Sequence, residues 1–164
     1  NKGSAAGIDE ATRRGLPTQV IEKNQTLSRA EYDDELLAAL TSAKPDLIIL
    51  AGFMHVLGKK VVDAYQGKMI NIHPSLLPKY PGLNTHRQAL ANGDKQHGLT
   101  IHYVTPELDA GPIIMQKSID LLPGDDEQTL TKRLLPYEHR CLVESVAFLI
   151  NRLNSATTDQ DKTI

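Results

Sequence analysis

The chain has 164 residues, of which 40% are hydrophobic and 23% charged, and its formal net charge is −2. This length suits one domain with its own core, and the balanced charge excludes the basic surface of a nucleic-acid-binding protein. The single cysteine excludes an intramolecular disulfide and fits a reducing compartment, and no apolar run reaches the ~18 residues that span a membrane. We expect a cytoplasmic protein that acts on small molecules, without nucleic-acid or membrane partners.

The beginning of the chain predicts two helices with a short strand between them. Ser4 is expected to cap a helix that reaches Arg14, and residues 18–21 read as a strand. Ser28 and Glu31 match a capping box, a pattern that marks the start of a helix. The leucine spacing that follows predicts one apolar helical face out to about residue 43.

The middle of the chain continues this alternation of strands and helices. Residues 46–51 are a continuous apolar run, which is typical of a strand buried on both faces in a parallel sheet. A helix is expected over residues 57–65 and a strand over 69–73. A loop with three prolines then leads into a short helix over residues 86–91.

Two more strands and a long helix complete the pattern. Residues 97–105 alternate and read as a strand, and residues 113–121 predict another. The link between these two strands is too short for a helical crossover, so an antiparallel pairing is favoured. Asp125 or Asp126 should cap a helix that extends to about Leu153.

The order of these elements predicts the fold class. Helices alternating with strands are typical of an α/β protein with a doubly wound, mostly parallel sheet. We expect a single domain over residues 1–153. Residues 154–164 are polar and are expected to form a disordered tail.

Asn71 and His73 are the first candidates for chemistry. They lie two residues apart on a predicted strand, so their side chains share one face, at the strand end where ligands of α/β proteins bind. A histidine can carry protons near neutral pH, and an asparagine N–H can stabilise an oxyanion. The alternatives are a buried histidine bonded to a carbonyl and an amide that satisfies loop backbone.

Other polar residues give weaker signals. Asp109, in a loop rich in Gly and Pro, could stabilise a charged histidine or bond its own turn. Four further histidines could in principle bind a metal: His86, His97, His102 and His139. No pair of them has the spacing of a known zinc motif, so we expect no metal site. Cys141 shares an apolar helical face with Leu142 and Val146 and is expected in the core.

The stretch Asn71-Ile72-His73-Pro74-Ser75-Leu76-Leu77-Pro78, followed by Asp109 within residues 107–112, resembles the folate-dependent formyltransferase family. Residues 79–83 and 85–90 narrow the resemblance to the branch that formylates glycinamide ribonucleotide, and it runs from Asn1 to about Arg152. It implies a Rossmann-like fold and formyl transfer from 10-formyltetrahydrofolate to the ribonucleotide amine in purine (IMP) biosynthesis, without metal. The tRNA-directed relatives, formyltetrahydrofolate hydrolase and an inactive folate-binding fragment are the alternatives.

The resemblance also implies roles for individual residues. Asn71 would stabilise the oxyanion of a tetrahedral intermediate, His73 would transfer protons, and Asp109 would keep His73 protonated. The folate would meet Arg29, Met54, His55, Val56, Leu57, Asn71, Val104, Thr105, Glu107, Leu108 and Asp109. The ribonucleotide would meet Gly52, Phe53, Met54, Pro74 and Glu138. Small molecules are the expected partners, and the chain is expected to be a monomer or a weak homodimer.

Three departures separate the chain from the family pattern. His55 stands where an arginine is usual, and residues 135–137 replace a more polar stretch, with Pro136 expected to disturb a helix interior. The family begins with a strand, a phosphate loop, a helix and a second strand, a unit of ~30 residues or more. This chain opens just past that unit. We therefore expect either a truncated version that lacks the phosphate-binding helix N-terminus or a chain whose missing part is supplied separately, and we expect the chain alone to be inactive.

Overall fold

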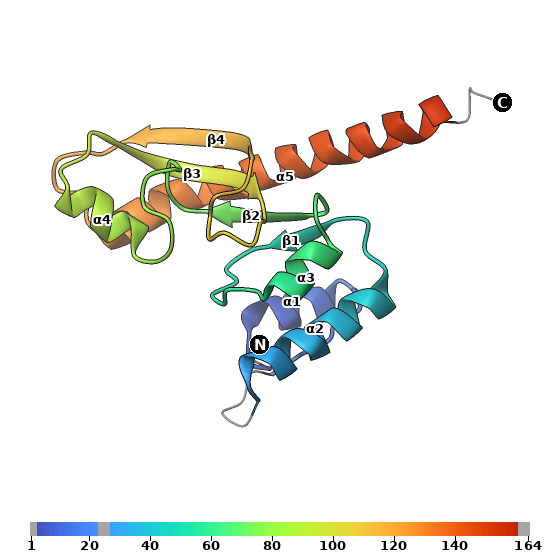
Figure 1. Ribbon diagram of the computed structural model, residues 1–164. Coiled ribbons are helices and arrows are strands. Elements are labelled where there is room, and N and C mark those ends of the chain that lie inside the picture. The colour runs from blue at the N-terminus through green and yellow to red at the C-terminus, as the bar shows by residue number, and fades with distance from the viewer. Residues whose placement is uncertain (1–2, 23–26, 161–164) are drawn as a thin grey trace.

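Four strands form one sheet in the computed structural model, which describes residues 3–22 and 27–160 (Figure 1). In the order β1-β2-β3-β4, they are Ile48–Leu50, Met69–His73, Gln96–Tyr103 and Ile113–Asp120. β1 pairs with β2 in parallel, whereas β3 is antiparallel to both β2 and β4. Three of these four strands therefore run in the same direction. The predicted α/β class with one sheet is confirmed, as is the antiparallel pairing of β3 with β4.

Five helices surround the sheet in the described part of the chain: α1 (Ala6–Arg13), α2 (Arg29–Ala43), α3 (Lys59–Ala64), α4 (Thr85–Ala91) and α5 (Glu127–Gln160). Helix α5 packs along β3 and β4, while α1, α2 and α3 gather beyond β1 (Figure 1). The predicted capping box starts α2: Glu31 N donates to Ser28 Oγ at 3.3 Å, and Ser28 N donates to Glu31 Oε2 at 2.8 Å. These bonds satisfy two N–H groups that the first turn leaves unpaired.

Three local predictions near the N-terminal half are wrong. Helix α1 begins after Ala5, and Ser4 does not cap it. Residues 18–21 form no strand, and no described strand pairs with them. Strand β1 is not buried on both faces, since Ile49 is 40% exposed. Helix α5 covers β3 and β4 and leaves this face of β1 open.

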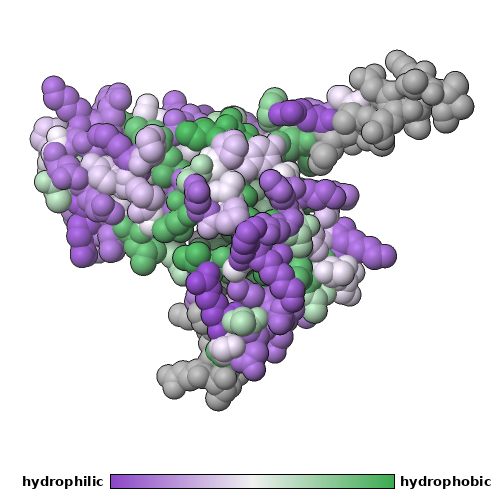
Figure 2. Space-filling view, viewed as in Figure 1, coloured by the Kyte–Doolittle hydropathy of each residue, from purple (hydrophilic) through white to green (hydrophobic). Residues whose placement is uncertain are grey.

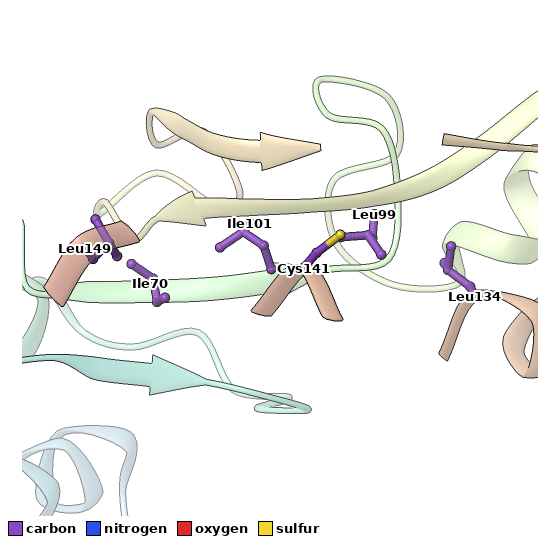
Figure 3. Close-up of a cluster of buried hydrophobic side chains, with 6 residues drawn as sticks. All are labelled: Ile70, Leu99, Ile101, Leu134, Cys141 and Leu149. Carbon is purple, nitrogen blue, oxygen red and sulfur yellow. The ribbon is translucent and has the colours of Figure 1, made fainter. Parts of the chain in front are cut away.

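One core cluster lies between α5 and the sheet (Figure 3). Its buried members are Ile70, Leu99, Ile101, Leu134, Cys141 and Leu149. Each large aliphatic side chain buried here contributes about 1.5–3 kcal/mol relative to an exposed one. The core position predicted for Cys141 is confirmed, and burial raises the pKa of its thiol, which makes the thiolate less accessible.

A second core cluster lies on the opposite face, where α2 and α3 pack near β1 and β2. It contains Ile48, Leu57, Val61, Val62 and Met69, with three leucines of α2 against them. Because side chains alternate along a strand, Ile70 faces α5 while Met69, Asn71 and His73 face away from it. The end of β2 therefore presents polar side chains beside an apolar cluster, on the face that α5 does not cover.

Helix α5 begins with the predicted aspartate cap and runs further than expected. Asp126 Oδ1 accepts a hydrogen bond from Thr129 N at 2.7 Å, which identifies Asp126 as the cap. The helix continues through Pro136 to Gln160, so the proline does not end it, and the predicted disordered tail is helical over residues 154–160. The rest of that predicted tail, residues 161–164, lies outside the described residues.

Hydrophobic residues also reach the surface over the middle of the face shown in Figure 2, while hydrophilic residues cover α2 and the α4 end. The described helices include none with the length and apolar character needed to cross a membrane.

Candidate active site

The end of β2 brings together side chains from two strands. Within the β2–β3 pairing, Asn71 lies opposite His102 and His73 lies opposite Thr100. Directly opposed residues of antiparallel strands share a face, so His102 joins the two predicted residues. From the sequence alone, His102 was a candidate only for a metal ligand. The signal that could have found it is the alternation of residues 97–105, which places His102 and Thr100 on one face.

His73 is held between two acceptors. Its side chain is 6% exposed, and Nε2 donates to the carbonyl oxygen of Tyr80 at 2.8 Å. Nδ1 lies 3.4 Å from Asp109 Oδ2. Only the imidazolium form has an N–H on both nitrogens and can donate to both acceptors at once. The structure therefore brings Asp109 within ion-pairing distance of His73, a contact that the sequence alone left open.

Asp109 is not a turn aspartate that bonds its own loop. It has a φ of 49°, in the left-handed region, and its carboxylate accepts a hydrogen bond from Gly82 N at 2.8 Å. Its side chain is only 9% exposed. The carboxylate thus ties the loop after β3 to the loop after β2, and it faces His73 and His102 at the same time.

Gly111 allows the Asp109 loop to approach β3, and replacing it with alanine should displace this loop. A Cβ at Gly111 would lie 1.8 Å from the carbonyl oxygen of Tyr103, which is backbone that cannot rotate away. We expect Gly111→Ala to lower the free energy of unfolding by about 1–3 kcal/mol. Gly7→Ala, where a Cβ meets nothing within 4 Å, is the matched control for urea unfolding. Equal stability of both variants would contradict this close approach.

His102 orients the amide of Asn71. Burial lowers the pKa of His102. The hydrogen bond to the Tyr103 carbonyl and the charge of the Asp109 carboxylate raise this pKa, but they do not offset the effect of burial. Nδ1 donates to the Tyr103 carbonyl oxygen at 2.8 Å, so in the neutral ring Nε2 is an acceptor. Asn71 Nδ2 lies 3.3 Å from that Nε2. This contact engages one N–H of the amide, and no second hydrogen-bond partner of Asn71 Nδ2 is found among residues 3–22 and 27–160.

Two cavities meet at these residues. The larger has a volume of about 690 Å³, within the usual range for a small-molecule site. Its lining residues are Gly52, Phe53, Met54, His55, Val56, Asn71, Ile72, His73, Pro74, Gly82, Leu83, Asn84, Thr85, Leu108, Asp109 and Glu138. The smaller is lined by Leu50, Phe53, His55, Val56, Leu57, Val62, Asn71, His102, Val104, Thr105, Pro106, Glu107, Leu108 and Asp109. Asn71 and Asp109 line both cavities.

Most residues assigned by resemblance lie where two ligands could meet them. The five residues assigned to the ribonucleotide all line the larger cavity. Of those assigned to the folate, all but Arg29 and Met54 line the smaller one. Met54 lines the larger cavity, and Arg29 lines neither. Instead, Arg29 Nη2 donates to the Leu57 carbonyl at 3.2 Å and ties the start of α2 to the loop after β1. The ligand contacts themselves stay predictions.

Two residues at the walls have unusual surroundings. The ring of His55 packs against Tyr32 and Phe53, with ring centroids 5.8 and 5.6 Å apart. His55 lines both cavities, so this departure from the family pattern lies at their junction. Glu138 comes from α5, and burial raises the pKa of its carboxyl while the nearby His139 opposes that shift.

The remaining histidines are not gathered into a metal site. Over residues 3–22 and 27–160, no group of three or more His, Cys, Asp or Glu side chains could hold a metal ion. His86 and His97 instead form a pair, with His86 Nδ1 2.8 Å from His97 Nε2 and the two rings nearly perpendicular.

The His86–His97 pair predicts a loss of stability in acid. Burial first, and then the charge of His86, lower the pKa of His97 to about 4. In the unfolded chain the pKa is near 6.5, so between these values the unfolded state binds more protons and stability falls as the pH decreases from about 6.5 to about 4. The free energy of unfolding, measured in urea at several pH values across this range, should fall as the pH decreases. The His97→Asn variant should show a smaller dependence on pH. The same slope in the variant would contradict the assignment.

Comparison with known proteins adds an independent observation. The family model described as "Formyl transferase" matches residues 1–146. Phosphoribosylglycinamide formyltransferase of Escherichia coli is 47% identical over 139 residues, which cover 85% of this chain and 66% of that protein. The trifunctional purine biosynthetic protein adenosine-3 of Drosophila melanogaster is 46% identical over 151 residues, which cover 92% of this chain and 11% of that protein.

Solved structures agree with these relatives. Phosphoribosylglycinamide formyltransferase from Bacillus halodurans superposes with a TM-score of 0.87 at 33% identity, covering 92% of this chain and 77% of that one. Phosphoribosylglycinamide formyltransferase from Coxiella burnetii, in complex with CHES, superposes with a TM-score of 0.78 at 46% identity. The superposition covers 84% of this chain and 65% of that one. The chain spans just under two thirds of the E. coli protein and a small part of the trifunctional one. On the family match and these likenesses, the chain belongs to the formyl transferase family.

Proposed function

We propose that this chain carries the catalytic residues that transfer a formyl group from 10-formyltetrahydrofolate to the amine of glycinamide ribonucleotide, a step of purine biosynthesis. The observation that carries the proposal is the position of Asn71 and Asp109, which line both cavities. A group transferred between two ligands must pass the point where their sites meet. The relatives named phosphoribosylglycinamide formyltransferase support the identity of the two ligands.

We assign the smaller cavity, whose volume is about 80 Å³, to the ring system of the folate because of the chemistry of its lining. Aliphatic side chains of three segments form its walls, among them Leu50, Leu57 and Val104. Glu107 and Asp109 add polar groups to the lining. An apolar slot with few polar groups is the usual way to bind and orient a heteroaromatic ring. The folate supplies the formyl carbon, and the protein orients that carbon toward Asn71.

The larger cavity suits the second ligand. Glu138 lies on its wall, and a carboxylate can accept hydrogen bonds from the hydroxyl groups of a ribose. Pro74 and the segment 52–54 form other parts of the wall. The amine would approach His73 from this side. In this arrangement the nucleophile and the formyl carbon come together over the end of β2, which places the reacting atoms near one another.

The side chains at the junction account for the chemistry. The amine nitrogen forms a bond to the formyl carbon, the carbonyl oxygen becomes an oxyanion, and the bond to the departing folate nitrogen then breaks. The free N–H of Asn71 donates to the oxyanion. The amine loses one proton and the departing nitrogen gains one. Nε2 of His73 is committed to Tyr80, so the Nδ1 edge, beside Asp109, carries this proton exchange.

A formyl-transfer assay on this chain tests the proposal. Assayed together with the phosphate-binding unit of the family, the chain should form product from 10-formyltetrahydrofolate only when glycinamide ribonucleotide is present. Release of formate without the acceptor would instead indicate hydrolysis, and formylation of methionyl-tRNA would indicate the tRNA-directed reaction. If neither product forms, folate binding measured by fluorescence decides whether the chain binds without turning over. We also propose a cytoplasmic monomer or weak homodimer, which sedimentation and fractionation would test.

A further inference from the structure

A second carboxylate, outside both cavities, is connected to His73 through Tyr80. The phenol oxygen of Tyr80 donates to Asp94 Oδ2 at 2.8 Å, and its backbone carbonyl accepts from His73 Nε2 at 2.8 Å. The main chain of Tyr80 therefore contacts His73, the proposed proton carrier, and the side chain of Tyr80 contacts Asp94. Asp94 lies just past α4, where its N–H donates to the carbonyl of Ala89 at 3.1 Å.

The conformation of Tyr80 requires such an anchor. Its φ is 58°, in the left-handed region that a bulky L-residue rarely adopts. A residue stays in this region only when its surroundings hold it there. The phenol is fully engaged, because it donates to Asp94 and accepts from Asn92 Nδ2 at 3.0 Å. Without these bonds, the backbone could relax and turn the carbonyl away from His73.

The carboxylate of Asp94 is itself held in place. Lys79 Nζ donates to Oδ1 at 2.9 Å, so the two oxygens bind the side chains of two successive residues, Lys79 and Tyr80. The Asp94 side chain is 15% exposed, whereas that of Lys79 is 59% exposed. An ion pair to an exposed lysine contributes little to the position of either side chain. The hydrogen bond of Asp94 to the phenol is therefore the one that fixes Tyr80.

We propose that Asp94 is a positioning residue for His73, acting through Tyr80. The carbonyl of Tyr80 can only accept a hydrogen bond, so it keeps a proton on Nε2 of His73 and fixes the plane of the ring. Nδ1 is then directed toward Asp109 and the reacting groups. The catalytic part of this inference rests on the proposed formyl transfer, whereas the positioning of the ring does not.

Three variants test the connection. Tyr80→Phe removes only the hydroxyl, Asp94→Ala removes the anchor, and Lys79→Met breaks the other bond of Asp94 as the matched control. ¹⁵N NMR of the whole chain should show a slowly exchanging proton on Nε2 of His73. His73→Gln identifies the resonance by its absence. This proton should exchange faster in Tyr80→Phe and Asp94→Ala, but not in Lys79→Met.

Turnover provides the second readout. In formyl transfer, kcat should fall roughly 10- to 100-fold in Tyr80→Phe and Asp94→Ala, with KM for both ligands nearly unchanged. The double variant should be no worse than either single one, because both remove the same anchor. Unchanged His73 resonances in both variants, or equal effects in Lys79→Met, would overturn the proposal. If the unaltered chain shows no turnover, the NMR measurement alone decides, and the failure belongs to the proposed function.

Discussion

Replacing His73 with glutamine should lower kcat for formyl transfer by about 10²- to 10⁴-fold, the usual contribution of a positioned acid–base group. Glutamine can keep an N–H near the Tyr80 carbonyl, so the loop after β2 should stay in place. It cannot carry a proton between the amine and the departing nitrogen. The rate is measured with both ligands saturating, and folate affinity is measured separately by fluorescence titration.

The control for this variant is His139→Gln. His139 is exposed on α5 and lines neither cavity, so its replacement should leave kcat within about twofold. Folate affinity should be similar in both variants, because His73 does not line the smaller cavity. A His73→Gln variant that turns over at the normal rate would remove His73 from the mechanism. A variant that loses folate binding as well would indicate that the site has collapsed.

Replacing Asn71 with leucine should have the second large effect. Leucine has a similar shape but lacks the N–H that would stabilise the oxyanion. Loss of one such donor typically reduces kcat by about 10²- to 10³-fold, or about 2.7–4 kcal/mol of transition-state stabilisation. Because this interaction strengthens only as charge develops on the oxygen, KM should change much less than kcat. Steady-state kinetics with each ligand varied in turn would separate the two constants.

Two further variants show whether the amide acts directly. Asn151→Leu, on the exposed surface of α5, is the matched control and should keep normal kinetics. His102→Gln leaves the amide of Asn71 present but removes the imidazole that orients it, so we expect a smaller loss, of roughly 10-fold. An equal loss in His102→Gln and Asn71→Leu would mean that the orientation, and not the donor itself, limits the reaction.

The sequence predicted the elements whose signals are local. The capping box at Ser28 and Glu31, the strand over residues 69–73 and the aspartate cap of α5 depend on residues within a few positions of one another. It also placed Asn71 and His73 on one face, because alternation along a strand is a local property. The strand predicted at residues 18–21 was wrong, since a strand requires a partner that local patterning does not supply.

By itself, then, the sequence determined the α/β class, the residues at the end of β2 and the resemblance of that motif to the formyltransferases. Only the tertiary structure decided that Asp109 reaches His73, that His102 holds Asn71, and that Tyr80 connects His73 to Asp94. The physical reason is the range of these contacts. Asp109 lies 27 residues from Gly82, which it bonds, and His102 lies 31 residues from Asn71. Strand register and loop packing bring such pairs together, and neither is encoded within a short window of residues.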